Sequence, residues 1–301
     1  MKVFVTGVSS FTGCHIARTF CESKSKNLSV YGVLTRKLSD YSGIEKQRLD
    51  YSLVDNWIEE APFGSQNFID ALLKIKPDVF INHGASIKGY REKNFDVRSC
   101  VEKATFNLTK VIEALSSQCQ FIHSGSVFES DGERGLSVYS PYGLAKTLIW
   151  EEISKNNNKI KMTKIVIPDP VGLYENTDRL GPVLFRKWNL GETVDLKNPD
   201  IIQDRIPAPW LARIYFEESR SIGLQSEKCR IVRPSAFCKS NLEWVQSLAV
   251  FFEKKTNKKC SAWNILPNFD SERKNTEPVS EVFNDEECEK FFNEYSDWLL
   301  K

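Results

Sequence analysis

The sequence lacks several features that would assign it to a broad class of protein. Lys and Arg number 41 against 40 for Asp and Glu among 301 residues, so neither sign of charge is in excess. This balance argues against nucleic acid or an anionic membrane as the main partner. No apolar run approaches the roughly 20 residues of a membrane span, and the first apolar run is too short for a signal peptide. We therefore expect a cytoplasmic protein.

Paired cysteines and clustered histidines are absent as well. The eight cysteines are scattered without a CxxC pair, which predicts free thiols in a reducing compartment. The three histidines, His15, His83 and His123, do not have the spacing of metal ligands, so we expect no metal site. The composition, 41% hydrophobic and 27% charged, is typical of a globular protein with a sizeable core.

Short apolar runs alternate with helical patterns through the first half of the chain. The apolar runs are KVFVT, LSVYGVLT, QRLD, PDVFINHGA, CQFIHSGS and TKIVIPDPVG. Helical patterns lie between them, including FTGCHIARTFCES, QNFIDALLKIK, a long stretch from Phe95 to Ser117, and YGLAKTLIWEEI. Strands and helices in alternation predict an α/β fold with a doubly wound parallel sheet, covered by helices on both faces.

The alternation of strand and helix patterns becomes less regular after about Pro170. We expect helices at RLGPVLFRKWNLG, APWLARIYFEESRSIG, SNLEWVQSLAVFFEKK and EECEKFFNEYSDWLLK, a strand at KCRIVRP, and a polar surface loop over residues 267–285. The second half is therefore predicted to form a smaller lobe.

The turn after the first strand carries Gly7 and Gly13. Glycines let backbone amides approach a pyrophosphate, and the N-terminus of the following helix supplies N–H groups and a partial positive charge. Ser10 stands where the commoner pattern has a middle glycine. The β-α-β setting at the start of the chain favours a dinucleotide site over a simple tight turn.

The end of the second strand bears on which dinucleotide binds. A carboxylate there would accept hydrogen bonds from the ribose hydroxyls of NAD. The sequence has Arg36 and Lys37 instead, and cations favour the 2′-phosphate of NADP, unless both are solvated loop charges. Asp50, at the end of QRLD, is a candidate for contact with the adenine amino group, with an exposed turn residue as the alternative.

A tyrosine and a lysine stand one helical turn apart in SPYGLAK. Ser140 is expected to cap this helix and Pro141 to occupy its first position, so Tyr142 and Lys146 share a face. A phenol has an unperturbed pKa of about 10. We expect Lys146 and the positive charge of an oxidised nicotinamide to lower the pKa of Tyr142. In the reducing direction Tyr142 would give its proton to a carbonyl oxygen as hydride reaches the carbon.

A hydroxyl that polarises the carbonyl is expected from the run FIHSGSVF. Ser124 or Ser126 would emerge at the carboxyl end of the sheet, where doubly wound proteins bind ligands.

At this point the chain resembles the extended short-chain dehydrogenases/reductases, particularly their nucleotide-sugar epimerases, dehydratases and reductases. The resemblance covers about the first 175 residues well and the remainder loosely. TGVSSFTG is similar to the family's TGxxGxxG motif. Residues 82–85 are similar to a motif after the fourth strand that lines the cofactor, and ATFNL is similar to a buried GTxNL segment. SGSVF resembles S/T-x-x-V-Y/F, which selects Ser124 as the catalytic hydroxyl, and YGLAK matches YxxxK.

The resemblance implies a Rossmann-like dinucleotide-binding domain over residues 1–168 and a smaller substrate-binding lobe over 169–301, with some segments of the second returning to the first. It implies Ser124, Tyr142 and Lys146 as catalytic residues. Ser126, Arg186 and Arg205 are the predicted substrate contacts, the two arginines chosen among four cations of the second half. The predicted cofactor-binding residues are Gly7, Ser10, Phe11, Thr12, Gly13, Arg36, Asp50, Tyr51, His83, Gly84, Ala85, Tyr142 and Lys146.

Departures from the family pattern reduce the number of reactions to consider. Family dehydratases follow the active-site Thr with Asp-Glu, whereas this chain has Gly125 and Ser126 there, which disfavours dehydration. Trp210 stands near a usual aspartate and Gln203 near a usual arginine, so substrate contacts in that segment differ from the family's.

The leading hypothesis is an NADP-dependent reductase acting on a keto group of a nucleotide-activated deoxysugar in the synthesis of polysaccharide precursors. The second is a nucleotide-sugar 4-epimerase with tightly bound NAD, and the third a dinucleotide-binding regulatory protein without turnover. Related enzymes often form homodimers through the two long helices, here Phe95 to Ser117 and the helix bearing Tyr142.

Overall fold

The structure is a computed structural model of the 301-residue chain. It describes residues 1–23, 27–85, 89–132, 137–138, 140–157, 159–221, 228–260, 263–265, 275, 277–278 and 285–300. The chain divides into two compact units, which are described separately. Unit 1 comprises Met1–Ile167 and Leu211–Val232, and unit 2 comprises Pro168–Trp210 and Arg233–Lys301.

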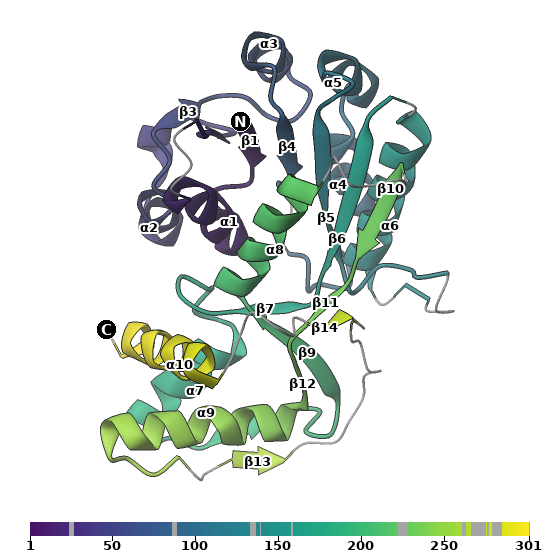
Figure 1. Cartoon of the computed structure of the whole chain (residues 1–301). Coiled ribbons are helices and arrows are strands. Elements are labelled where there is room, and N and C mark those ends of the chain that lie inside the picture. Colours follow the sequence, from purple (N-terminus) through teal and green to yellow (C-terminus); the bar gives the residue numbers. More distant parts are fainter. Residues whose placement is uncertain are drawn as a thin grey trace. The chain divides into compact units, whose positions relative to one another are not determined.

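Unit 1 is built on a seven-stranded sheet with the order β10-β6-β5-β4-β1-β2-β3 (Figure 1). Every neighbouring pair is parallel. The strands are β1 (Lys2–Thr6), β2 (Ser29–Val33), β3 (Asn56–Ile58), β4 (Val79–Asn82), β5 (Gln120–Ser126), β6 (Lys161–Ile167) and β10 (Cys229–Val232). The predicted α/β fold with a doubly wound parallel sheet is confirmed.

Helices cover both faces of this sheet. They are α1 (Phe11–Glu22), α2 (Gly43–Tyr51), α3 (Gln66–Ile75), α4 (Val97–Ala104), α5 (Leu108–Ala114), α6 (Pro141–Asn156) and α8 (Ala208–Ser221), with a short 3-10 turn η1 (Leu38–Asp40). On one face, side chains of α3 to α6 share a core with Phe80 and Phe121. On the other, Phe20 of α1 meets Phe216 of α8 with ring centroids 5.2 Å apart. Figure 1 shows α8 in front of the sheet and α4 behind it.

Helix α6 begins as the sequence predicts. The Ser140 side chain accepts a hydrogen bond from the Gly143 amide at 3.1 Å, and Pro141 occupies the first turn. The cap satisfies one of the amides that a helix start leaves without a partner. Tyr142 is thereby fixed in the first turn of the helix, directly after Pro141.

Two predicted elements are wrong. The stretch from Phe95 to Ser117 forms two helices, α4 and α5, because Asn107 adopts a left-handed conformation with φ of 51° between them. Its side-chain amide donates to the Gly64 carbonyl at 2.9 Å. The ATFNL segment therefore lies at a break, where Phe106 is 53% exposed rather than buried. The run QRLD lies within α2 and is not a strand.

The described residues of unit 2 form a three-stranded sheet, β12-β9-β7, and three helices around an aromatic core. Its strands are β7 (Asp169–Val171), β8 (Val194–Leu196), β9 (Ile202–Pro207), β11 (Pro234–Ser235), β12 (Phe237–Ser240), β13 (Trp263–Ile265) and β14 (Glu277–Pro278). Its helices are α7 (Leu180–Asn189), α9 (Asn241–Thr256) and α10 (Asp285–Leu299). The predicted helices of this half are present, whereas its short strands were not predicted.

Residues 211–232 belong to unit 1, although they lie in the second half of the chain. The substrate-binding role of residues 169–301 stays a prediction. The predicted surface loop over 267–285 lies largely outside the described residues.

All eight cysteines are described, and each is a free thiol. Within the described part of the chain, no helix has the length and apolar character needed to cross a bilayer.

The break between α4 and α5 can be tested through Gly64. A Cβ atom at Gly64 would lie 1.8 Å from the Phe106 carbonyl oxygen, whereas one at Gly43 would meet nothing within 4 Å, and both residues have positive φ. We expect Gly43→Ala to cost about 1–2 kcal/mol of unfolding free energy for the left-handed backbone alone. Gly64→Ala should cost about 1–3 kcal/mol more for the forced contact. Urea unfolding of both variants measures the difference, and equal losses would contradict this account.

Candidate active site

The backbones at the ends of β1 and β4 come into direct contact. Gly7 has φ of +73°, and a Cβ atom there would lie 2.9 Å from the Gly84 Cα. A Cβ atom at Gly13 would lie 2.0 Å from the Gly7 carbonyl oxygen. Strand β1 pairs with β2 on one side and β4 on the other, so this contact marks the point where the strand order reverses. Doubly wound sheets bind ligands at this point.

Ser10 replaces the middle glycine without backbone strain. Its φ is −80°, and its side chain caps α1 by accepting from the Gly13 amide at 3.1 Å. The position needs a cap rather than a positive φ, so a serine suits it. Phe11 and Thr12 form the first turn of the helix. A cradle closed to side chains, next to a helix N-terminus, fits the pyrophosphate of a dinucleotide.

Thr6 holds the end of β4 against β1. Its hydroxyl accepts hydrogen bonds from the amides of His83 and Gly84, at 2.9 and 2.8 Å, and donates to the Ile81 carbonyl at 3.3 Å. The predicted cofactor-lining residues His83, Gly84 and Ala85 therefore follow β4 directly beside the glycine-rich turn. Their contacts with a cofactor stay a prediction.

Tyr142 and Lys146 lie beside the end of β5. Lys146 is buried, and its ammonium donates to the Ser124 carbonyl. The Ser126 side chain lies near enough to the Tyr142 hydroxyl to lower the pKa of the phenol. The rings of Tyr90 and Phe95 contact the Tyr142 ring edge-on, with centroids 5.4 and 6.0 Å away. The structure thus brings the predicted phenol, ammonium and serines together at one strand end.

The surroundings of Tyr142 within the protein raise its pKa. Burial raises it, the negative charge of Glu129 raises it further, and the hydrogen bond from Ser126 lowers it in part. Burial also lowers the pKa of Lys146, against the opposing effect of Glu129. Because burial and the nearby negative charge both disfavour the phenolate, Tyr142 is a neutral phenol at ordinary pH. The lowering expected from Lys146 together with an oxidised nicotinamide stays a prediction.

Glu129 is a site residue that sequence reasoning missed. Its carboxylate forms an ion pair with Lys164 at 2.6 Å, with both side chains buried, and accepts from the Ser126 amide at 2.6 Å. A Cβ atom at Gly125 would lie 3.1 Å from the carboxylate and 3.0 Å from the Lys164 Cε. Gly125 thus leaves room for the ion pair. The unusual glycine was visible in the sequence, but its buried partners were not.

A second group of hydrogen bonds surrounds Ser124. Its hydroxyl is 2.6 Å from the Tyr215 hydroxyl of α8 and 2.7 Å from the His83 Nδ1. The His83 Nε2 is 2.7 Å from the Thr12 hydroxyl. Burial, with the Lys146 charge, lowers the pKa of His83 to about 3, so the ring is neutral. Tyr215 was not predicted, because nothing in the sequence places a residue 91 positions away beside Ser124.

Arg36 follows β2 and is engaged with its surroundings. It forms an ion pair with Glu45, with both side chains 44% exposed, and its guanidinium lies 4.1 Å from the centre of the Tyr41 ring. No carboxylate stands among residues 34–37, directly after β2. The contact of Arg36 with a cofactor stays a prediction.

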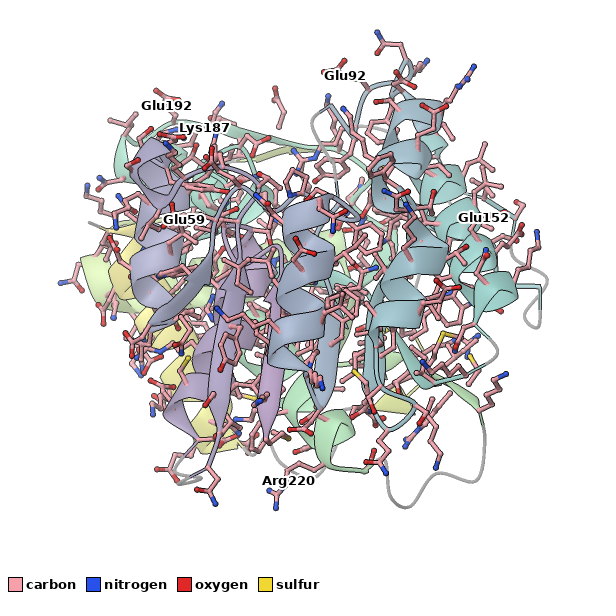
Figure 2. The ribbon with its side chains drawn as sticks, turned by 90° about the horizontal axis from the view of Figure 1, so that it is seen from above. Glu59, Glu92, Glu152, Lys187, Glu192 and Arg220 are labelled. Carbon is pink, nitrogen blue, oxygen red and sulfur yellow. The ribbon has the colours of Figure 1, made fainter. Side chains whose placement is uncertain are left out.

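Asp50 does not lie where it was expected. It is an exposed residue of α2, paired with Lys46 at 2.6 Å. Strand β3 begins after this helix, and Glu59, labelled in Figure 2, follows its end and accepts from the Leu38 amide at 2.8 Å. Glu59 therefore holds the strand-end position that Asp50 was predicted to occupy. The Tyr51 hydroxyl, next along the chain, lies 3.3 Å from the His15 Nδ1.

The two predicted substrate arginines have different surroundings within unit 2. Arg186 is exposed on α7 and donates to the Thr177 carbonyl at 3.3 Å. Arg205 is 1% exposed, donates to the Gln203 and Asn241 side chains, and lies 3.6 Å from an Asp169 oxygen. Arg205 is thus part of the interior of unit 2. Substrate contacts of both arginines stay predictions.

Potential metal ligands do not gather in the described part of the chain. Among those residues, no three His, Cys, Asp or Glu side chains are placed to hold a metal ion.

Solved structures similar to this chain are mostly nucleotide-sugar epimerases. A UDP-glucuronic acid 4-epimerase from Bacillus cereus, in complex with UDP-glucuronic acid and NAD, has 17% identity and a TM-score of 0.72, covering 100% of this chain and 99% of that one. The UDP-Glc/GlcNAc 4-epimerase from Campylobacter jejuni has 16% identity and a TM-score of 0.70, covering 99% of each chain. Identities this low show a shared fold alone.

The third similar structure is that of the Bordetella bronchiseptica enzyme WbmH in complex with NAD+. It has 14% identity and a TM-score of 0.68, covering 100% of this chain and 98% of that one. No curated protein sequence matches the chain significantly. A family model, described as the NAD dependent epimerase/dehydratase family, matches residues 3–200. The match spans well over half of the 301 residues, so the chain belongs to the NAD dependent epimerase/dehydratase family.

Proposed function

We propose that the chain is an oxidoreductase that reduces a keto group of a nucleotide-activated deoxysugar. The observation that carries the proposal is the meeting of Tyr142, Lys146 and a serine hydroxyl at the end of β5. A nicotinamide dinucleotide held by the glycine-rich turn would supply the hydride. Gly7, Gly13 and the first turn of α1 are the residues proposed to hold it.

Tyr142 is suited to act as the general acid. Reduction of a ketone places a new proton on the carbonyl oxygen, and a positioned side chain must provide that proton. Burial keeps the phenol protonated, so the proton is available when the carbonyl arrives. Lys146 lies one helical turn along α6, and its ammonium stabilises the phenolate that forms when the proton leaves.

The surroundings of β2 favour NADPH as the reductant. The chain leaves β2 with Arg36 and Lys37 and without a carboxylate for the ribose hydroxyls. Arginine binds phosphate through charge-assisted hydrogen bonds. Glu45 competes for the same guanidinium, so the preference for NADPH depends on Arg36 exchanging Glu45 for the 2′-phosphate. Net reduction is the reaction that draws on NADPH.

A second candidate is a nucleotide-sugar 4-epimerase with tightly bound NAD. It is favoured by the similar solved structures, of which several are UDP-sugar 4-epimerases and several hold NAD. In this case Tyr142 must first lose its own proton, and as a phenolate it then takes a proton from a sugar hydroxyl and returns it. Protein that retains NAD through purification and interconverts two UDP-sugars without added reductant would support the epimerase and contradict net reduction.

Replacement of Tyr142 tests the general acid. Tyr142→Phe should lower turnover with a keto nucleotide sugar about a hundredfold or more, while the dissociation constant of the dinucleotide changes little. Tyr31→Phe removes a phenol on β2, away from the site, and serves as the control. Steady-state oxidation of NADPH measures turnover, and fluorescence titration measures binding. An unchanged rate in Tyr142→Phe would rule out this role.

The competition between Glu45 and the 2′-phosphate gives a second prediction. Arg36→Ala should raise the dissociation constant of NADPH about tenfold, the effect of losing one charge-assisted hydrogen bond, and leave that of NADH within about twofold. Glu45→Gln should tighten NADPH severalfold, because it frees the guanidinium. Arg98→Ala disrupts a similar surface pair with Glu102 on α4 and is the control. Equal changes for NADPH and NADH would contradict a contact with the 2′-phosphate.

A further inference from the structure

We infer that Ser126 is the catalytic hydroxyl that works with Tyr142, and that Ser124 is a positioning residue held in a fixed hydrogen-bond chain with Tyr215, His83 and Thr12. This inference rests on the proposed function and assigns its residues. It departs from the prediction for Ser124, which came from the spacing of SGSVF.

The chain begins at Tyr215, whose side chain is fully buried. Among the described residues, the partner recorded for its hydroxyl is Ser124, at 2.6 Å. Buried hydroxyl protons are almost always donated to an acceptor. Burial raises the pKa of Tyr215, so the phenol keeps this proton. Tyr215 therefore donates, and the Ser124 oxygen accepts.

Because Tyr215 donates its proton, the direction of every other hydrogen bond in this hydrogen-bond chain is fixed. With its oxygen accepting from Tyr215, Ser124 donates its own proton to the His83 Nδ1 at 2.7 Å. A neutral imidazole has one N–H, and an accepting Nδ1 places it on Nε2. The Nε2 then donates to the Thr12 hydroxyl at 2.7 Å. The chain thus runs from α8 through the ends of β5 and β4 to the first turn of α1.

A proton held in this way is not available to a substrate. To polarise a carbonyl, Ser124 would have to withdraw its proton from His83 and leave a half-buried nitrogen without a donor. Its backbone carbonyl is also engaged, by the Lys146 ammonium. Ser124 is therefore suited to fix the ends of β4 and β5 and the Lys146 ammonium relative to one another.

Ser126 has the opposite arrangement. Its oxygen accepts from the Phe128 amide at 3.3 Å, and among the described residues no acceptor is recorded for its own proton. Its side chain also lies near enough to Tyr142 to lower the pKa of the phenol. Glu129 accepts from the Ser126 amide at 2.6 Å and fixes the backbone that carries the hydroxyl. A hydrogen bond to the phenol oxygen becomes stronger when the phenol loses its proton, because the acceptor is then charged. Ser126 can therefore stabilise the phenolate that reduction leaves on Tyr142.

Matched alanine variants separate the two serines. Ser126→Ala should lower turnover with a keto nucleotide sugar about a hundredfold, with little change in KM, in dinucleotide binding or in thermal midpoint. Ser124→Ala should lower the thermal midpoint and weaken dinucleotide binding, while turnover at saturating substrate falls less than about tenfold. Ser154→Ala removes a hydroxyl that bonds within α6 and is the control. A hundredfold loss in Ser124→Ala with Ser126→Ala near wild type would overturn the inference.

The tautomer of His83 supplies a readout that does not depend on any activity. Nitrogen NMR of the labelled full chain should show His83 neutral with its proton on Nε2, the resonances being assigned by comparison with His83→Gln. Tyr215→Phe removes the first donor of the chain and should perturb the His83 signals. A proton on Nδ1 would make the Ser124 oxygen accept from His83 as well as from Tyr215, which would free the Ser124 proton and overturn the inference.

The two readouts distinguish failure of the inference from failure of the proposed function. A wild-type protein that has the expected tautomer but reduces no keto nucleotide sugar contradicts the proposed function and the catalytic role of Ser126, while the positioning chain stands. A wild-type protein that is active but has the other tautomer contradicts the inference alone.

Discussion

The direct contact of the Gly7 and Gly84 backbones is the constraint on which the site depends. Because no side chain fits between the ends of β1 and β4, the glycine-rich turn and the residues after β4 form one continuous surface. Thr6 closes this contact with two accepted hydrogen bonds. The His83 ring is placed as a result, and it reaches Thr12 on one side and Ser124 on the other. The positions of the nucleotide turn and of the strand end at β5 are thus mechanically linked.

The electrostatics of the site follow from burial more than from any single pair of charges. Two ammonium groups, Lys146 and Lys164, lie with one carboxylate, Glu129, in a region where charge is poorly solvated. Glu129 raises the pKa of both Tyr142 and Lys146, so it favours a protonated phenol beside a charged lysine. This is the state from which a ketone can be protonated. Lys164 pairs with Glu129 and thereby offsets the desolvation of its carboxylate.

The sequence predicts those parts of the fold that depend on neighbours in the chain. The cap of α6 by Ser140, and with it the placing of Tyr142 and Lys146, follows from local spacing alone. The break at Asn107 did not, because it depends on a contact with Gly64, 43 positions away. The strand predicted at QRLD is wrong because four residues carry too little periodicity to separate a strand from a helix. Glu129 and Tyr215 join the site only through tertiary packing, which a single sequence does not reveal.

Two departures from the family pattern have a physical explanation in this structure. These explanations help to decide between an enzyme and a regulatory protein without turnover. Ser10 replaces a glycine at a position that requires a helix cap, and it provides one. Gly125 stands where a dehydratase has an acidic residue, and its missing side chain leaves room for the buried Glu129 and Lys164 pair. Each departure is matched by a contact that a chain released from selection for the site would not be expected to build. The pattern therefore favours an enzyme with an altered reaction over a regulatory protein that has lost its chemistry.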